Sequence, residues 1–304
     1  MRRGATLGLL LAASLPAFAS AGEAKLQLYV MPDTQAWAWN QGGTTLEAWR
    51  AVAKALCRER QRFALVLHTG DLVDNPRPVE WSNALSVMRE LDACRMPYAI
   101  AFGNHDFDNH PAPEPAGDRG WQQLRGQLAS QPLERGPSGR SALHPLTEGW
   151  FVVTADFMPS RADLDWIEQA VRARPGARFV LLSHQCADAT GLFAGPALAW
   201  CRELLARSPA IRSVVSGHWL GARRESWKQA RREGAPPVIA LYQNYQHVPA
   251  LAPWGVVIEL EPGSGDLCVW SENLVDGATR HPDATSEAVG WVGASSDRTC
   301  FSGD

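Results

Sequence analysis

Short apolar runs alternate with longer amphipathic stretches along most of this chain. The runs are four to six residues long and rich in β-branched and aromatic side chains, which is typical of buried strands. The longer stretches place apolar residues three and four positions apart, as on one face of a helix. We predict strands at 26–31, 63–67, 98–101, 150–154, 179–182, 211–215, 238–242 and 256–260, and helices at 45–60, 78–91, 161–172 and 197–208. This alternation favours the α/β class, with parallel strands covered by helices.

Two stretches depart from the alternation. Residues 107–149 are rich in Pro, Gly, Asn and Asp, and only 121–128 has a short helical pattern. Loops of this length are usually functional or flexible. From Asp276 onward the chain is polar and rich in turn residues, so we predict an extended tail over 276–304 that is held down at Cys300.

The length and composition suit one large domain. With 304 residues, 45% of them hydrophobic, the chain can bury a full core. Its first residues combine Arg2 and Arg3 with an apolar stretch and then small residues, which is typical of a cleaved signal peptide. The apolar stretch is short for a membrane span, and Pro16 interrupts it. We therefore predict a signal peptide at 1–21, one domain at 22–304, and a periplasmic or secreted location.

The charge balance disfavours nucleic acid as a partner. The chain has 29 basic and 32 acidic residues, and removal of Arg2 and Arg3 with the signal peptide leaves 27 against 32, a net charge of −5. A mildly acidic protein is not suited to coating nucleic acid, so an extracellular nuclease is a weak alternative. Nothing in the sequence indicates a membrane span after signal cleavage.

Cysteine usage agrees with export. The six cysteines form an even set without any CxxC pair, so disulfides are favoured over a thiolate metal site. Many connectivities are open to six cysteines. From proximity in the sequence alone, we predict the pairs Cys57 with Cys94, Cys186 with Cys201, and Cys268 with Cys300.

Five polar clusters follow or end apolar runs, so we expect all of them on loops at one edge of a sheet. They contain carboxylates, an amide oxygen and imidazoles, which are the ligands that divalent metal ions accept. Each cluster taken alone would be a weak signal, but five in one order are specific. The clusters are Pro32-Asp33-Thr34-Gln35, Gly70-Asp71-Leu72-Val73-Asp74, Gly103-Asn104-His105-Asp106, Ser183-His184-Gln185 and Gly217-His218-Trp219.

In order and chemistry, these clusters resemble the calcineurin-like metallophosphoesterases over about residues 26–260, and the opening tetrapeptide resembles a Pro-Asp-Thr-Gln branch of that family. The resemblance implies a sandwich of two mixed β-sheets flanked by helices. It also implies hydrolysis of phosphate mono- or diesters by a water molecule that two divalent metal ions activate. In that family the segment after the third cluster often shapes the substrate entrance, so 107–149 becomes a candidate lid-like insertion.

The same resemblance implies a ligand set. Asp71 would bridge both ions, and the second ion would also take Asn104, His184 and His218, a set that suits Mn²⁺, Fe²⁺ or Zn²⁺. The first ion would take Asp33 and two histidines, but those two histidine positions hold Gln35 and Leu220 here. Asp33, Asp71 and the amide oxygen of Gln35 would leave an all-oxygen set that favours Mg²⁺, Mn²⁺ or Ca²⁺.

His105 and Asp106 are the predicted catalytic pair. The family role of His105 is to give a proton to the departing alcohol, and Asp106 would orient its ring and raise its pKa. Asp74 either makes a supporting hydrogen bond or ends the turn with Asn75. His68 lies on the strand before the second cluster, where a core position is favoured over one near the metals.

Several further residues are open to two interpretations. His110, His144 and His247 could each replace a lost ligand, although loop histidines are mostly solvated. The basic run Arg223, Arg224, Lys228, Arg231 and Arg232 is either a phosphate clamp or, more simply, a solvated helix face. The stretch 243–246 could contact substrate or support the ligands, and Trp37, Trp39 and Trp219 could line a pocket or fill the core.

The sequence thus predicts an exported metal-dependent phosphoesterase that acts on a small phosphorylated substrate or a phosphoprotein. The alternative is a non-catalytic protein that binds phosphorylated ligands with one metal ion on a degenerate phosphoesterase scaffold. Metal content distinguishes the two, because two equivalents support the enzyme and one or none supports the binding protein.

Overall fold

The computed structural model describes residues 25–40, 46–107, 119–128, 133–147, 149–188, 191–192, 199–219, 221–227, 238–244, 254–277 and 298–302. The predicted signal peptide lies outside this part of the chain. So do His110, Leu220 and His247, the residues from Lys228 to Arg232, and most of the predicted tail.

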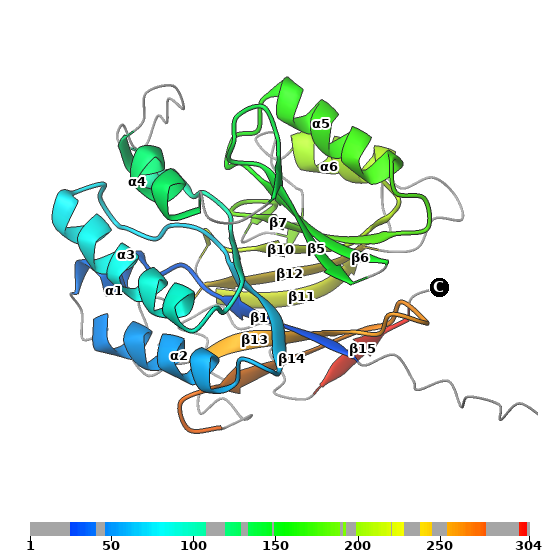
Figure 1. The fold of residues 1–304 in the computed structure, drawn as a ribbon. Helices are drawn as coiled ribbons and strands as arrows, with labels where there is room; N and C mark the ends of the chain where they lie inside the picture. Colours follow the sequence, from blue (N-terminus) through cyan, green and yellow to red (C-terminus); the bar gives the residue numbers. More distant parts are fainter. Residues whose placement is uncertain are drawn as a thin grey trace, which may run out of the picture.

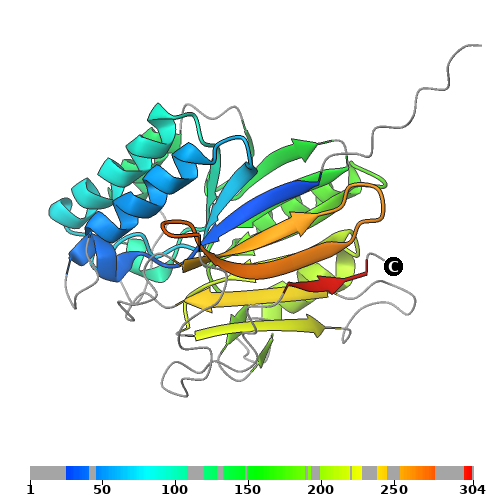
Figure 2. The same ribbon diagram turned by 90° about the horizontal axis from the view of Figure 1, so that it is seen from below.

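Two mixed β-sheets pack face to face, with helices on their outer sides (Figure 1). One has six strands in the described residues, in the order β15-β14-β13-β1-β2-β3, and Figure 2 shows β1, β13 and β14 side by side within it. Of the neighbouring pairs in this order, β1–β2 and β2–β3 are parallel and the other three are antiparallel. The bounds are β15 (Thr299–Phe301), β14 (Leu267–Asn273), β13 (Trp254–Leu260), β1 (Leu26–Met31), β2 (Phe63–His68) and β3 (Tyr98–Ile100).

The other large sheet has seven strands in the described part of the chain, in the order β11-β12-β10-β7-β6-β5-β4. Its four central strands are parallel, and antiparallel strands complete both edges. The bounds are β11 (Gly221–Trp227), β12 (Val238–Asn244), β10 (Ile211–Ser216), β7 (Arg178–Ser183), β6 (Trp150–Ala155), β5 (Ala142–Thr147) and β4 (Glu134–Arg135); a small hairpin joins β8 (Ala187–Asp188) to β9 (Gly191–Leu192).

The helices cover the outer faces of the two large sheets. Figure 1 shows α2 and α3 on one side of the sheets and α5 and α6 on the other. The short η1 follows β3 and carries the third polar cluster. The bounds are α1 (Gln35–Trp39), α2 (Leu46–Arg58), α3 (Pro78–Ala93), η1 (Asn104–Asp106), α4 (Arg119–Leu128), α5 (Arg161–Arg172) and α6 (Ala199–Arg207).

Alternation along β1 explains why its sequence is apolar throughout. Leu28 and Val30 point into the core between the two sheets, whereas Tyr29 and Met31 point outward into the core beneath α2 and α3. Since both faces of the strand are buried, the run has no polar face, which is typical of central strands in layered α/β folds. The predicted fold class is therefore confirmed.

All eight predicted strands and all four predicted helices are present, with bounds that differ by a few residues at most. The structure adds β5, β11, β14 and the four shorter strands β4, β8, β9 and β15. The interpretation of the basic run as a helix face is wrong for Arg223, Arg224 and Glu225, because these residues lie on the edge strand β11. Charged residues are common on edge strands, where they discourage pairing with other chains, and they hide the period-two pattern.

The three predicted disulfides are confirmed: Cys57–Cys94, Cys186–Cys201 and Cys268–Cys300. The last bridge lies where β15 pairs with β14, so the described end of the predicted tail is attached to the six-stranded sheet at Cys300. Among the helices in the described residues, none is both long and apolar enough to cross a membrane.

The described parts of the predicted lid-like insertion are largely regular. Helix α4 packs beside α3, and β4 and β5 extend one edge of the seven-stranded sheet. The turn before β5 is attached to the end of β6 by Arg140, whose Nε lies 2.6 Å from a carboxylate oxygen of Asp156. The two side chains are only 4% and 1% exposed. Burial raises the pKa of Asp156 to about 6, although Arg140 opposes this increase.

We expect Arg140→Met to lower the free energy of unfolding by about 3–5 kcal/mol, because it leaves the Asp156 carboxylate buried without its cation. Arg161→Ala is the matched control, since Arg161 pairs with Asp165 on the surface with side-chain exposures of 63% and 46%. That loss should be at most about 1 kcal/mol. Urea unfolding measures both variants, and equal losses would contradict a structural role for the buried pair.

Candidate metal centre

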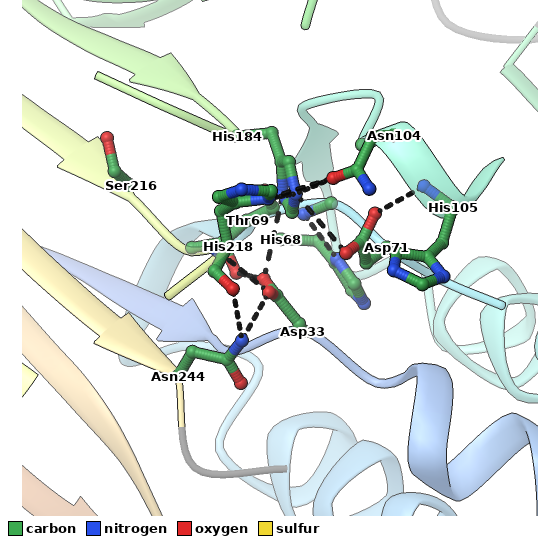
Figure 3. A network of polar contacts seen from close by, with 12 residues as sticks. Asp33, His68, Thr69, Asp71, Asn104, His105, His184, Ser216, His218 and Asn244 are labelled. Carbon is green, nitrogen blue, oxygen red and sulfur yellow. Dashed lines mark hydrogen bonds and ion pairs between the residues drawn. The ribbon is translucent and has the colours of Figure 1, made fainter. Parts of the chain in front are cut away.

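The five polar clusters meet at one edge of the sandwich. Asp33, Asp71 and Asn104 follow β1, β2 and β3 of the six-stranded sheet, whereas His184 and His218 follow β7 and β10 of the seven-stranded sheet. In both sheets these strands are parallel, so their carboxyl ends point to the same side. Figure 3 shows the side chains gathered there. The prediction that these loops share one edge is confirmed.

Four side-chain atoms from four different loops form the centre of this site. Nε2 of His184 lies 3.2 Å from a carboxylate oxygen of Asp71 and 3.1 Å from Oδ1 of Asn104. Nδ1 of His218 lies 2.8 Å from the same Asn104 oxygen and 3.1 Å from Nε2 of His184. We call these atoms the four-atom cluster: Asp71 Oδ2, Asn104 Oδ1, His184 Nε2 and His218 Nδ1.

The tautomer of His184 explains why this cluster suits a cation. Its Nδ1 lies 2.8 Å from the main-chain carbonyl of Thr69, which can only accept, so Nδ1 carries the hydrogen. In the neutral ring, Nε2 therefore presents a lone pair toward the oxygens of Asp71 and Asn104. Lone pairs at this distance repel unless a proton or a cation lies between them.

The distances also match a metal ion. Ligand atoms bound at 2.0–2.2 Å and at right angles to one another lie about 3.0 Å apart. The contacts within the four-atom cluster span 2.8–3.2 Å. The donor set of carboxylate, amide oxygen and two imidazoles therefore fits one divalent ion.

The electrostatics of the site favour positive charge at its centre. Burial alone would lower the pKa of His184, but the carboxylates of Asp71 and Asp33 outweigh it and raise this pKa to about 9. Burial likewise opposes ionisation of Asp71, but His184 and hydrogen bonds hold its pKa below the usual value. Two buried carboxylates thus require a cationic partner, whether proton or metal.

The backbone takes left-handed conformations to aim two of these side chains. Asp71 has φ 48° and His218 has φ 70°, values that non-glycine residues seldom adopt and that cluster at functional sites. The neighbouring glycines leave room for the carboxylates. A Cβ atom on Gly103 would lie 2.2 Å from Oδ1 of Asp71, and one on Gly217 would lie 2.1 Å from Oδ1 of Asp33.

Asp33 lies beside the four-atom cluster but is already held by protein donors. Its Oδ1 accepts from the Thr69 hydroxyl at 2.6 Å, and its Oδ2 accepts from the His218 backbone N–H at 2.8 Å and from the Asn244 amide at 2.6 Å. Burial and repulsion from Asp71 raise the pKa of Asp33 to about 7, against the opposing charge of His184. Both oxygens of Asp33, which is predicted for the first metal position, therefore already accept hydrogen bonds from the protein.

Gln35 is the other described residue predicted for that first position. Its Nε2 lies 3.4 Å from a carboxylate oxygen of Asp74. Its Oε1 is buried and has no hydrogen-bond partner in the described part of the chain. An unpaired buried oxygen is costly, so it fits a ligand role at the first position. Asp33, Asp71 and this amide oxygen are the three oxygen donors that the sequence predicts for the first position.

The ring of His105 is held by Asp74, and Asp106 has a different role from the one predicted. Nδ1 of His105 donates to the Asp74 carbonyl at 2.7 Å, and the Asp74 carboxylate lies 3.7 Å away. Asp106 is fully buried and accepts from the backbone N–H groups of Leu72, Val73 and Gly103 at 2.7, 3.3 and 2.9 Å. It therefore joins the second and third loops instead of orienting the histidine.

Other predicted residues have mainly structural contacts. His68 is buried in the core, and its Nδ1 accepts from the Gly70 N–H at 3.1 Å while Nε2 donates to Thr34 at 3.1 Å. Burial lowers the pKa of His68 to about 3. Gln243 donates to the Val30 carbonyl at 2.8 Å, which links the two sheets. Trp37 is buried in the core beneath α2, and Trp39 is 40% exposed.

Sequence reasoning missed two residues near the cluster, Thr69 and Phe157, and named a third, Trp219, only as a possible pocket residue. Thr69 fixes both Asp33 and His184, and its only sequence signal is its place just before Gly70. The ring centroid of Phe157 lies 5.7 Å from that of His184 and 6.0 Å from that of His218. Its position just after β6, where a loop begins, is the sequence signal that could have indicated a place near the site. Trp219 contacts the His218 ring at 5.1 Å and is 40% exposed, so it borders the site.

Comparisons with known proteins agree with this geometry. Residues 26–221 match the family model described as calcineurin-like phosphoesterase. Among curated proteins, the chain is 25% identical over 172 residues to the uncharacterized protein YvnB of Bacillus subtilis; this match spans 53% of the chain but only 13% of YvnB.

Two solved structures share the fold at low sequence identity. A dimetal phosphatase from Danio rerio superposes with a TM-score of 0.57 at 13% identity, covering 82% of this chain and 96% of the other. The purple acid phosphatase PPD1 from yellow lupin seeds gives 0.59 at 14% identity, covering 84% of this chain and 52% of the other. At this identity the likeness establishes the fold alone.

We expect Gly217→Ala to lower the free energy of unfolding by about 1–3 kcal/mol, because the added Cβ would displace the Asp33 carboxylate and the Thr69 side chain. Gly263→Ala is the control, since no atom lies within 4 Å of its Cβ position. Thermal unfolding of both variants checks the expectation. Equal melting temperatures of the two variants would show that the absence of a side chain at Gly217 is not required for stability.

Proposed function

This chain belongs to the calcineurin-like phosphoesterase family, and on that premise we propose that it is an exported, metal-dependent hydrolase of phosphate mono- or diesters. The four-atom cluster is the observation that carries the proposal, because four lone-pair donors converge at the edge where both sheets end. Such a set has little purpose in a protein without a bound cation.

Asp71, Asn104, His184 and His218 would hold one divalent ion, and Asp33, Gln35 and Asp71 would supply the donors for another. Bound divalent ions lower the pKa of water to give a nucleophile and neutralise the phosphoryl oxygens. The Thr69 carbonyl fixes the ring of His184, and such contacts raise the basicity and order of a metal-binding imidazole. Phe157 packs against both imidazoles and limits their rotation.

His105 would give the departing oxygen its proton. The Asp74 carbonyl holds Nδ1–H, so Nε2 is the nitrogen left to exchange a proton with substrate. The Asp74 carboxylate at 3.7 Å gives the protonated ring an ion-pair partner. The His105 side chain is 24% exposed. The backbone N–H of His105 donates to Asp71 at 2.9 Å, so the proposed acid is connected directly to a proposed metal ligand.

Export is supported by the three disulfides. Disulfide bridges persist in oxidising compartments such as the periplasm and the extracellular space, and are rare in the cytosol. The sequence pattern of residues 1–21 points the same way. A small phosphorylated compound or a phosphoprotein would be the substrate, because the metal centre recognises the phosphoryl group that the two share.

We expect the mature protein with Mn²⁺ to hydrolyse p-nitrophenyl phosphate or its diester, and Asp71→Ala to abolish this activity. His105→Gln should slow an alkyl phosphate ester by about 10²–10⁴-fold, because a poor leaving group needs the proton. The same variant should slow the p-nitrophenyl ester less, since p-nitrophenolate leaves without one. Rates on both esters, measured at saturating metal, test the assignment.

Arg161→Ala is the control for these rates, because Arg161 lies on the exposed face of α5 and its ion pair is on the surface. It should retain wild-type activity on both esters. If His105→Gln slows the two esters equally, the histidine positions the site and does not donate a proton. If the wild-type protein hydrolyses neither ester with any divalent metal, the proposed hydrolase activity is wrong.

A non-catalytic protein that binds phosphorylated ligands with one metal ion is the second candidate. The observation that favours it is the Asp33 carboxylate, whose oxygens accept from Thr69, His218 and Asn244. An oxygen satisfied by protein donors has less need of a cation. The two candidates therefore differ in how many ions the site holds.

We expect two equivalents of metal per chain for the enzyme, measured by elemental analysis after equilibration with Mn²⁺ and gel filtration. His184→Ala should remove at least one equivalent, because His184 contributes the central atom of the four-atom cluster. Asn244→Ala serves as a matched probe of the first position, since it removes one of the two hydrogen bonds to Oδ2 of Asp33 and leaves the one from the His218 backbone N–H. One equivalent in the wild-type protein, without hydrolysis, would favour the binding protein.

A further inference from the structure

A second cavity lies at the opposite end of the strands that carry the metal centre. It measures about 630 Å³, within the usual range for small-molecule sites. Leu65 and Tyr98 line it near the start of β2 and at the start of β3, whereas the metal-binding loops follow the ends of these strands. Leu65 and His68 are three positions apart, which is about 10 Å along a strand. The cavity is therefore separate from the four-atom cluster.

The inner wall of this cavity is mostly apolar. Leu65, Met96 and Tyr98 line it and are each at most 4% exposed, so the wall belongs to the interior of the protein. Pro97 and Pro145 stand at the mouth, together with the charged residues Asp92 and Arg95. A cavity with an apolar interior and a polar rim is typical of sites for small, mainly apolar ligands.

His144 is the one residue of the inner wall that does not suit an apolar core. Its side chain lies on β5 and is buried, with 5% exposure, but no hydrogen bond joins its imidazole to another described residue. Its neighbours two positions away on the strand, Ala142 and Leu146, are apolar. The ring nitrogens of His144 are not among the fully buried unpaired atoms of the described residues, so they are accessible from the cavity, where a bound molecule can form hydrogen bonds with them.

The chemistry of His144 restricts the ligand. Burial and the nearby Arg135 lower the pKa of His144 to about 3, so the ring is neutral at ordinary pH. A neutral imidazole has one donor and one acceptor nitrogen, and it matches a hydroxyl group, which can also donate and accept. The inner end of the ligand is therefore uncharged.

The rim contains a second unusual residue. Arg95 follows the end of α3 with φ 57°, a left-handed conformation in which glycine is the favoured residue after a helix. An exposed arginine held in this conformation at the mouth is consistent with a function there, because local strain tends to persist at binding sites.

We propose that this cavity is a binding site for a small, mainly apolar or aromatic molecule that carries a hydroxyl group, with His144 as the inner hydrogen-bond partner. Leu65, Met96 and Tyr98 would enclose the apolar body of the ligand. The proposal does not depend on the phosphoesterase activity, since none of these residues belongs to the metal centre.

The test uses 2-naphthol and 2-methylnaphthalene, which have similar shapes but differ in the hydroxyl group. We expect the wild-type protein to bind 2-naphthol more tightly, measured by fluorescence titration. His144→Leu should weaken binding of 2-naphthol about tenfold, the usual cost of one lost hydrogen bond in a buried site, and leave 2-methylnaphthalene unchanged or tighter. The preference between the two probes should therefore disappear or reverse.

Hydrolytic activity and a rim variant provide the controls. His144→Leu should retain hydrolysis of p-nitrophenyl phosphate at the wild-type rate, which shows that the variant is folded. Arg95→Gly should keep the preference for 2-naphthol. Either of two results would overturn the proposal: no preference of the wild-type protein for 2-naphthol, or an unchanged preference in His144→Leu.

Discussion

The Nδ1–H group of His184 donates to the main-chain carbonyl of Thr69, and this bond joins the two sheets where their parallel strands end. It spans 115 residues of sequence. Because it fixes the tautomer, it turns the Nε2 lone pair toward Asp71 and Asn104. The cationic character of the site follows from this contact, since a free ring could turn its N–H inward and satisfy the same oxygens without a metal.

The two predicted metal positions differ in what balances their charge. At the second position, a histidine nitrogen and an amide oxygen lie close to the Asp71 carboxylate. The lone pairs of these three groups repel one another unless a cation lies between them. At the first, Asp33 is balanced by a hydroxyl, a backbone N–H and the Asn244 amide. Gln35 still leaves one buried oxygen unpaired, which keeps a second ion compatible with the site.

The sandwich places different chemistry at the two ends of the same strands. The carboxyl ends of β1, β2 and β3 carry the polar loops of the metal centre. The beginnings of β2 and β3, with β5 opposite them, border an apolar cavity that contains one unpaired imidazole. A rigid core between the sheets separates the two sites, because Val30, Leu67 and Leu182 are close to fully buried there. The same packing that aligns the polar loops at one edge thus leaves a cavity at the other edge.

The sequence alone determined eight of the strands, the four long helices, the disulfide pairs and the order of the polar clusters. These depend on local signals: apolar runs for strands, three- and four-residue spacing for helices, and short separations between paired cysteines. The apolar runs before the polar clusters predicted loops at one edge, and the family resemblance grouped Asp71, Asn104, His184 and His218 as ligands of one ion.

Only the tertiary structure decided which partner each side chain takes. Asp106 follows His105 directly, yet it binds backbone N–H groups of another loop, while Asp74, 31 residues away, holds the histidine. The roles of Thr69, Phe157 and Asn244, and the unpaired position of His144, depend on contacts between segments far apart in the chain. Hydrogen bonds and packing are set by distance in space, and no local pattern of residues encodes that distance.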